Sequence, residues 1–202
     1  NSLTPISSIC QTLNSQLDKL EPSPDSADLK EGLDVIEERA KGLRDFISVY
    51  ARIAKLPEPQ KINFSVFELL QKVKRFFVNE AVEISDRGAD FKMFGDPVHL
   101  EQVLINLIKN AIEACDVDAS PVEISCQRKG SLIEFVVVDT GKGISNPANL
   151  FVPFYSTKEK GAGIGLTLSR QIAAKHGGQL LFENRSDGLG AIARLQIPDT
   201  VA

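Results

Sequence analysis

The chain has 202 residues, of which 43% are hydrophobic and 25% charged, and its formal net charge is −4. These values fit a folded protein with one domain and a smaller element, or with two small domains. They give no electrostatic footprint for nucleic acid, and no stretch approaches the roughly 18 consecutive apolar residues that a membrane-spanning helix needs.

Two amphipathic helices are predicted in residues 1–56. Apolar residues recur at three- and four-residue steps from Leu3 to Leu20, and the same spacing resumes from Leu29 to Ala54. The stretch 21–26 contains two prolines and interrupts the pattern. Two such helices form an antiparallel hairpin, and pairing with a second copy in a four-helix bundle would bury its long apolar seam. The alternative is packing of the hairpin on the rest of its own chain.

Residues 57–202 are predicted to form a separate domain, because Pro57 and Pro59 end the second helix. Ser65 and Glu68 make a capping box, which opens a helix with an apolar face that extends to Phe76 and Phe77. Short strands are expected at 81–85 and 89–94. Asp96 followed by Pro97 is a typical helix start, and this helix should run to about residue 114.

The second half of the domain reads as strands with one further helix. Strands are expected at 122–127, 132–138, 179–183 and 191–197, and a helix at 165–175 that ends at Gly177. This order predicts an α+β fold, a two-layer α/β sandwich with a mixed sheet and helices on one face.

The predicted helix that begins at Pro97 carries two asparagines. Asn106 and Asn110 are four positions apart, so both amides lie on one helix face. Amide oxygens are hard neutral ligands that suit Mg²⁺, which is commonly shared with nucleotide phosphates. Two solvent-facing asparagines are the alternative reading.

Three further segments contain glycine, hydroxyl or lysine residues in an order that is typical of ligand-binding loops. Asp139 follows an apolar strand and precedes Gly141 and Gly143, which would let the backbone approach a flat ring while the carboxylate accepts a hydrogen bond. Residues 151–158 place aromatic side chains before hydroxyls and a lysine. Residues 161–167 alternate glycines before a helix, whose N-terminus attracts anions. An ordinary turn or loop is the alternative for each segment alone.

In this order the four segments resemble the N, G1, F and G2 boxes of two-component sensor histidine kinases, whose ATP-binding fold is shared with gyrase, mismatch-repair ATPases and a heat-shock chaperone. The resemblance covers about residues 62–198 and implies ATP and Mg²⁺ as cofactors, with Asn110 as a metal ligand and Asn106 beside it. Asp139 would bond the adenine amino group, and Thr157 and Lys158 would lie on an ATP lid. The implied nucleotide-binding residues are Asn106, Lys109, Asn110, Asp139, Gly141, Gly143, Ile144, Thr157, Lys158, Gly163, Gly165, Leu166 and Thr167.

One residue favours a kinase over an ATPase. Where the ATPase relatives carry a glutamate that activates water, this chain has Asn106, which cannot act as a base. The resemblance therefore implies transfer of the γ-phosphate to a histidine and relay to a response regulator. Two alternatives remain: an ATPase or serine kinase of the same fold, and a dimerising module that binds nucleotide without catalysis.

The histidine that accepts the phosphate is expected outside this chain. By resemblance, Asn1 lies four positions after it, which implies a truncated chain with no catalytic acceptor of its own. His99 and His176 occupy predicted helix ends, where histidine often has a structural role. The resemblance also implies a homodimer through the hairpin and a cytoplasmic location, with any membrane anchor outside these residues.

Overall fold

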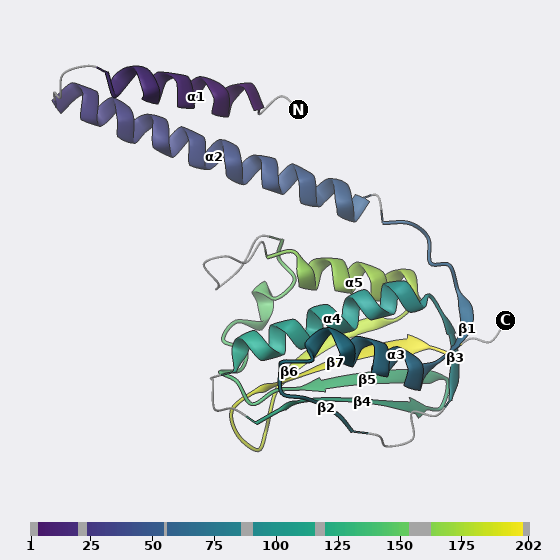
Figure 1. Ribbon diagram of the computed structural model, residues 1–202. Coiled ribbons are helices and arrows are strands. Elements are labelled where there is room, and N and C mark those ends of the chain that lie inside the picture. The colour runs from purple at the N-terminus through teal and green to yellow at the C-terminus, as the bar shows by residue number, and fades with distance from the viewer. Residues whose placement is uncertain are drawn as a thin grey trace. The chain divides into compact units, whose positions relative to one another are not determined.

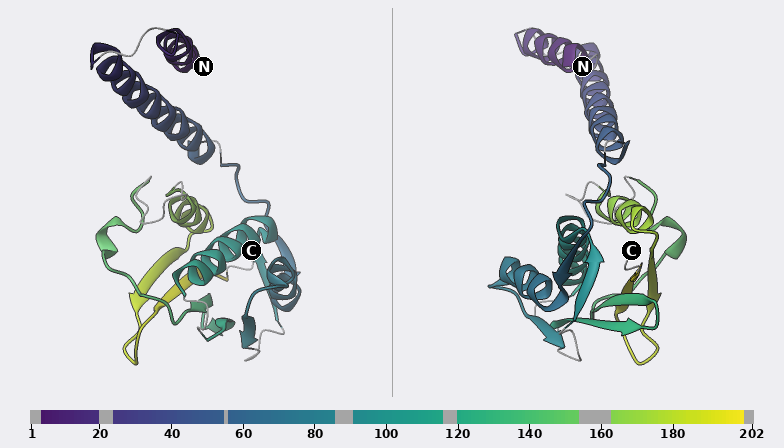
Figure 2. Two further views of the ribbon diagram at one scale, coloured as in Figure 1. Left: turned by 60° about the vertical axis from the view of Figure 1, so that its left-hand side comes forward. Right: turned by 90° about the vertical axis from the view of Figure 1, so that its right-hand side faces the viewer.

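The computed structural model describes residues 4–19, 24–54, 56–85, 91–115, 120–153 and 163–199. The chain divides into two compact units, Asn1–Lys55 and Leu56–Ala202. The first is a pair of helices, and the second combines helices with β-sheet (Figure 1, Figure 2). Within the described ranges, no helix has the combination of length and apolar character needed to cross a membrane.

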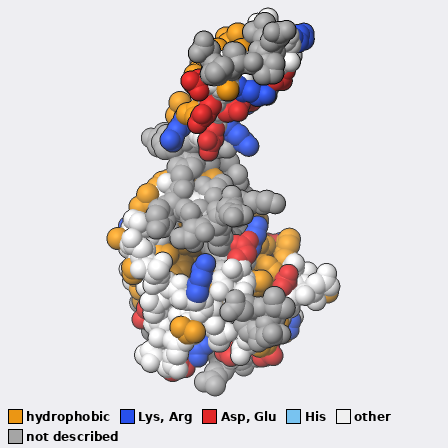
Figure 3. All heavy atoms as spheres, turned by 90° about the vertical axis from the view of Figure 1, so that its left-hand side faces the viewer, with side chains coloured by type: hydrophobic (Ala, Val, Ile, Leu, Met, Phe, Trp, Pro, Cys, Tyr) orange, Lys and Arg blue, Asp and Glu red, His pale blue; other side chains and the backbone are white. Residues whose placement is uncertain are grey.

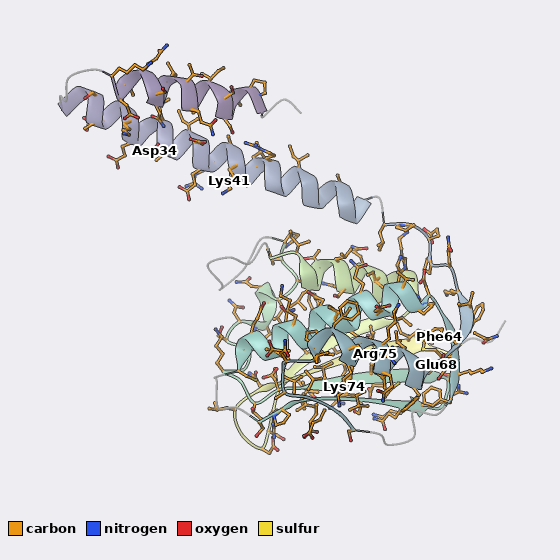
Figure 4. All side chains as sticks on the ribbon, viewed as in Figure 1. Asp34, Lys41, Phe64, Glu68, Lys74 and Arg75 are labelled. Carbon is orange, nitrogen blue, oxygen red and sulfur yellow. The ribbon has the colours of Figure 1, made fainter. Side chains whose placement is uncertain are left out.

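The first unit is an antiparallel hairpin of α1 (Thr4–Leu17) and α2 (Pro24–Ala54). The second helix begins at a proline, which is favoured in the first helical turn because its missing N–H is not needed there. Polar contacts fix the antiparallel register. Asn14 Nδ2 donates to Asp34 Oδ1 at 3.0 Å, and the Lys30 ammonium lies 2.7 Å from the Asp18 carboxylate. Figure 4 labels Asp34 on α2.

Only part of the apolar seam is buried within the hairpin. Cys10, Leu33 and Ala40 are at most 9% exposed. On the face drawn in Figure 3, hydrophobic side chains of the hairpin lie among acidic and basic ones. Large apolar side chains that remain 39–57% exposed on the two helices are Ile6, Ile9, Leu13, Leu29, Val35, Ile36, Leu43 and Ile47.

The second unit contains two sheets. A five-stranded sheet has the order β2-β4-β5-β7-β6, in which β2 and β4 are parallel and the other neighbours antiparallel. A separate antiparallel pair joins β1 and β3. The elements are β1 (Ile62–Ser65), α3 (Val66–Lys74), η1 (Arg75–Phe77), β2 (Val82–Ser85), β3 (Lys92–Gly95), α4 (Pro97–Ala114), β4 (Val122–Lys129), β5 (Leu132–Val138), η2 (Pro147–Asn149), α5 (Gly165–Lys175), β6 (Gln179–Asn184) and β7 (Ala191–Pro198).

Helices α3, α4 and α5 cover one face of the five-stranded sheet (Figure 1, Figure 2). The core between the layers is built from fully buried side chains that alternate along the strands, such as Ile133 and Phe135 on β5, and from helix residues such as Leu104 and Ile172. The α+β fold with a mixed sheet and helices on one face, predicted from the sequence, is confirmed.

The helix starts follow the local chemistry that predicts them. Ser65 Oγ accepts from the backbone N–H of Glu68 at 3.2 Å, which caps α3. Asp96 Oδ1 accepts from the N–H groups of Val98 and His99 at 2.9 and 3.2 Å, which caps α4. Figure 4 shows Glu68 near one end of α3 and Lys74 and Arg75 at the other.

Three details differ from the expectation. Phe76 does not belong to the apolar face of α3, because the helix ends at Lys74 and the 3-10 turn that follows leaves this ring 61% exposed. The strand expected at 89–94 is Lys92–Gly95, and residues 86–90 lie outside the described part. Its partner, Ile62–Ser65, was not predicted as a strand.

Candidate functional site

The second half of α4 meets the start of α5 at Asn106. Its Nδ2 donates to the hydroxyl of Ser169 at 3.0 Å, and Ser169 is 2% exposed. Gly165 begins α5 against the same amide, and a Cβ at Gly165 would lie 2.1 Å from Asn106 Oδ1. With glycine at this position, the helix start approaches the Asn106 amide without displacing it. The structure therefore brings together residues from two of the four predicted segments. Asn110, one turn further along α4, is half-buried.

The loop that follows β5 is attached to the C-terminal end of the same helix. Asp139 is 7% exposed, and its Oδ1 accepts from the backbone N–H of Gly141 at 2.9 Å. The N–H of Lys142 donates to the carbonyl of Ala114 at 3.2 Å. A Cβ at Gly141 would lie 2.3 Å from that carbonyl oxygen, so the close approach requires glycine. The third predicted segment thus joins the end of α4.

The end of the β6–β7 hairpin supports Asp139 from the other side. The N–H of Ala191 donates to Asp139 Oδ1 at 3.1 Å, and a Cβ at Gly190 would lie 2.0 Å from the Asp139 carbonyl oxygen. Arg185 Nη1 lies 3.4 Å from the same carbonyl oxygen. The sequence pattern does not single out Arg185 or Asn184, because their contacts with the loop join residues that are 46 and 40 positions apart.

The remaining predicted residues are placed as follows. The Lys109 side chain is 67% exposed and lies 3.9 Å from the Glu113 carboxylate. Gly163 has a φ of +62°, which favours glycine, and Leu166 packs partly against the core. The Thr167 hydroxyl donates to the Phe151 carbonyl at 3.2 Å. Thr157, Lys158 and Asn1 lie outside the described residues.

Both histidines are buried between the start of α4 and the end of α5. His176 Nε2 accepts from the backbone N–H of Asp96 at 3.2 Å, and Nδ1 lies 2.9 Å from the Ile172 carbonyl oxygen, which defines a neutral tautomer protonated at Nδ1. The His99 ring stands edge-on to that of His176 with centroids 5.9 Å apart. These contacts tie two helices together, which is a structural role.

Burial affects the ionisation of both His176 and Asp96. It lowers the pKa of His176; the Ile172 carbonyl and Asp96 oppose this shift, while His99 and Lys61 add to it. Burial alone would raise the pKa of Asp96, but the N–H groups of Gln60, His99 and Val98 stabilise the carboxylate, and the net pKa is lowered. His176 is therefore a neutral imidazole beside the capping carboxylate of Asp96.

No three His, Cys, Asp or Glu side chains within the described ranges are grouped so as to hold a metal ion. Helix α4 also carries two amide side chains, those of Asn106 and Asn110, which lie one turn apart on one helix face. Such neutral oxygens suit a hard cation that is shared with the phosphates of a ligand.

Comparison with known proteins identifies the family. Residues 95–201 match the family "Histidine kinase-, DNA gyrase B-, and HSP90-like ATPase", and the chain belongs to it. The chain is 31% identical to sporulation kinase C of Bacillus subtilis over 98% of this chain and 46% of that protein. It is 38% identical to the sensor protein FixL of Bradyrhizobium diazoefficiens over 56% of this chain and 23% of that protein. The chain thus spans less than half the length of these relatives.

Solved structures agree with this assignment. The catalytic domain of histidine kinase ThkA is 29% identical, covers 70% of this chain and 97% of its own, and has a TM-score of 0.61. ThkA in complex with response regulator protein TrrA shares the fold over 98% of this chain and 59% of that chain, at 23% identity and a TM-score of 0.64. The predicted resemblance to two-component sensor histidine kinases is confirmed.

Proposed function

We propose that residues 57–202 bind Mg·ATP and donate its γ-phosphate to a histidine. The observation that carries the proposal is the convergence of the predicted segments on the second half of α4. Asn106 meets the glycine-rich start of α5 at Gly165, and the carbonyl of Ala114, the last residue of the helix, holds the loop that begins at Asp139. A base-binding loop and a phosphate-binding helix start would then flank a single helix that carries the metal ligands.

The donor set of α4 fits a magnesium ion. Asn106 and Asn110 would hold it through amide oxygens, and the bond from Asn106 Nδ2 to Ser169 orients the first amide. When bound, the ion supplies positive charge that offsets the charge of the phosphates. The first N–H groups of α5, which have no partner within the helix, would add donors for the same anion.

The chemistry of Asn106 favours a phosphoryl donor over a hydrolase. Its amide cannot remove a proton from water, and Nδ2 is already bonded to Ser169. In the transfer, a neutral imidazole nitrogen forms a bond to the γ-phosphorus while the bond from phosphorus to the β–γ bridging oxygen breaks, and ADP leaves with that electron pair. The protein contributes position and charge to this step.

We propose that residues 1–56 form a four-helix bundle with a second copy. The exposed apolar side chains on the two helices support this, because neither helix can bury them against the other while Cys10, Leu33 and Ala40 already fill the contact between them. A second hairpin would cover Ile36 and Leu43 on the longer helix.

The partner that receives the phosphate is proposed by likeness. ThkA, whose chain shares this fold, has been solved in complex with response regulator protein TrrA. We infer a response regulator as the partner of this chain, which would receive the phosphoryl group from a phosphohistidine.

Calorimetric titration tests the proposed function. ADP and a non-hydrolysable ATP analogue are added to the chain with and without Mg²⁺, and to the variants Asn110→Ala and Asn63→Ala. Asn63 is exposed on β1 and serves as the matched control. We expect Mg²⁺ to strengthen binding to the parent and to Asn63→Ala, and to have little effect on Asn110→Ala. A parent chain that binds no nucleotide contradicts the proposal.

A further inference from the structure

The side-chain amide of Asn184, the last residue of β6, forms hydrogen bonds with both the N–H and the carbonyl of Ile144. The N–H of Ile144 donates to Asn184 Oδ1 at 2.6 Å, and Asn184 Nδ2 donates to the carbonyl of Ile144 at 3.0 Å. One side-chain amide thus exchanges two hydrogen bonds with one residue, as the backbone of a paired antiparallel strand does. The contact joins two segments that lie 40 positions apart.

The 139–144 loop is attached at three places, and Asn184 provides the last. Its start is fixed by the hydrogen bonds between Asp139 and Ala191, and its middle by the bond from the Lys142 N–H to the end of α4. Between the middle and the end, Gly143 has a φ of +72°, and a Cβ there would lie 2.9 Å from Asn184 Oδ1. The glycine lets the backbone turn onto the amide without a clash.

The same hairpin supports both ends of the loop. Ala191 donates to the Asp139 carboxylate at the start, and Asn184 bonds Ile144 at the end. Asn184 is an exposed residue, so its hydrogen bonds compete with water and contribute little to the stability of the whole domain. Their local effect is to restrict a loop that contains two glycines, which would otherwise sample many conformations.

We propose that Asn184 is a positioning residue for recognition of the nucleotide base, acting through the backbone of Ile144. This inference rests on the proposed function, in which the 139–144 loop binds adenine. A fixed loop presents its hydrogen-bonding groups in one geometry, which fits one base better than another. Because the loop is already ordered, binding does not carry the entropic cost of ordering it. Without the amide, adenine affinity and discrimination against guanine both fall.

The experiment compares ADP and GDP binding to the parent, Asn184→Leu and Glu183→Ala by calorimetry. Leucine keeps the size of asparagine and removes both hydrogen bonds. Glu183 is the exposed neighbour on β6, and its carboxylate bonds Arg194 rather than the loop, so Glu183→Ala is the matched control. We expect Asn184→Leu to bind ADP about tenfold more weakly, as the loss of one or two neutral hydrogen bonds implies, and to favour ADP over GDP less than the parent does.

A purely structural role would lower the melting temperature without changing the ADP-to-GDP ratio, and that outcome overturns the inference. A parent that fails to bind ADP contradicts the proposed function instead. If Asn184→Leu does not fold, hydrogen exchange of the Ile144 amide in the parent tests the contact without a variant. The Ile144 amide must then exchange much more slowly than an exposed loop amide, and fast exchange overturns the inference.

Discussion

Substitution of Gly165 by alanine separates nucleotide binding from folding. The added Cβ would lie 2.1 Å from Oδ1, 2.8 Å from Cγ and 3.0 Å from Nδ2 of Asn106. All three atoms belong to one side chain, which can rotate away without movement of the backbone. The amide of Asn106 is therefore displaced, and its bond to Ser169 is broken.

The cost to stability is expected to be small. The lost hydrogen bond contributes about 1 kcal/mol, and the buried Ser169 hydroxyl left without its partner adds a cost of roughly 1 kcal/mol or more. Alanine in place of glycine at a helical position offsets up to about 1 kcal/mol. The net loss of about 1 kcal/mol corresponds to a fall in melting temperature of roughly 2–4 °C for a chain of this size.

The effect on Mg²⁺-dependent binding is expected to be much larger. Because Asn106 is a proposed metal ligand, its displacement should weaken Mg·ADP binding about tenfold or more, measured by calorimetry beside a thermal melt. Gly188→Ala is the control, because a Cβ at Gly188 meets no atom within 4 Å. Mg·ADP binding to Gly165→Ala that matches the parent, with the small change in melting temperature, would refute the placement of Asn106 at the metal.

Three further predictions follow from the contacts described. Gly141→Ala should destabilise the domain by several kcal/mol, because its Cβ would lie 2.3 Å from a backbone oxygen that cannot rotate away; a urea midpoint unchanged from the parent would contradict this. Because the pKa of His176 is lowered by burial, the unfolded chain takes up a proton that the folded chain does not, and stability falls as the pH drops below about 6.5. The variant His176→Gln should lose this slope between pH 7.5 and 5.5, and an equal slope in both proteins argues against a buried neutral imidazole. Ile36→Glu should convert a dimer into a monomer in sedimentation, whereas Lys41→Glu on the same helix should not; equal masses for both variants and the parent would contradict hairpin pairing.

Local sequence signals predict the starts of α3 and α4 and the end of α5. Asp96 and Pro97 specify the start of α4, because one side chain caps the N–H groups and the other fits the first turn. Gly177 has a φ of +75° and lies just after the end of α5, at a position where helices favour glycine. These signals lie within a few residues of the feature they determine, so no knowledge of the tertiary fold is needed.

Long-range pairings could not be predicted in this way. The strand Ile62–Ser65 forms because it pairs with Lys92–Gly95, and its own four residues do not indicate that partner. The role of Asn184 could not be predicted either, because an asparagine at the end of a strand is common and only the fold places Ile144 beside it. The sequence predicts that Gly141 lets the backbone approach a ring and that Gly165 belongs to an anion site, but only the fold shows that both lie against α4.

The central claim is that this domain donates the γ-phosphate instead of hydrolysing it, and one labelling experiment tests it most directly. The chain is incubated with Mg²⁺ and γ-labelled ATP, alone and with a hairpin that carries a phosphoacceptor histidine, and both protein-bound label and free phosphate are measured. The account predicts acid-labile label on the hairpin and little free phosphate from the chain alone. Steady multiple-turnover release of phosphate by the chain alone would contradict it.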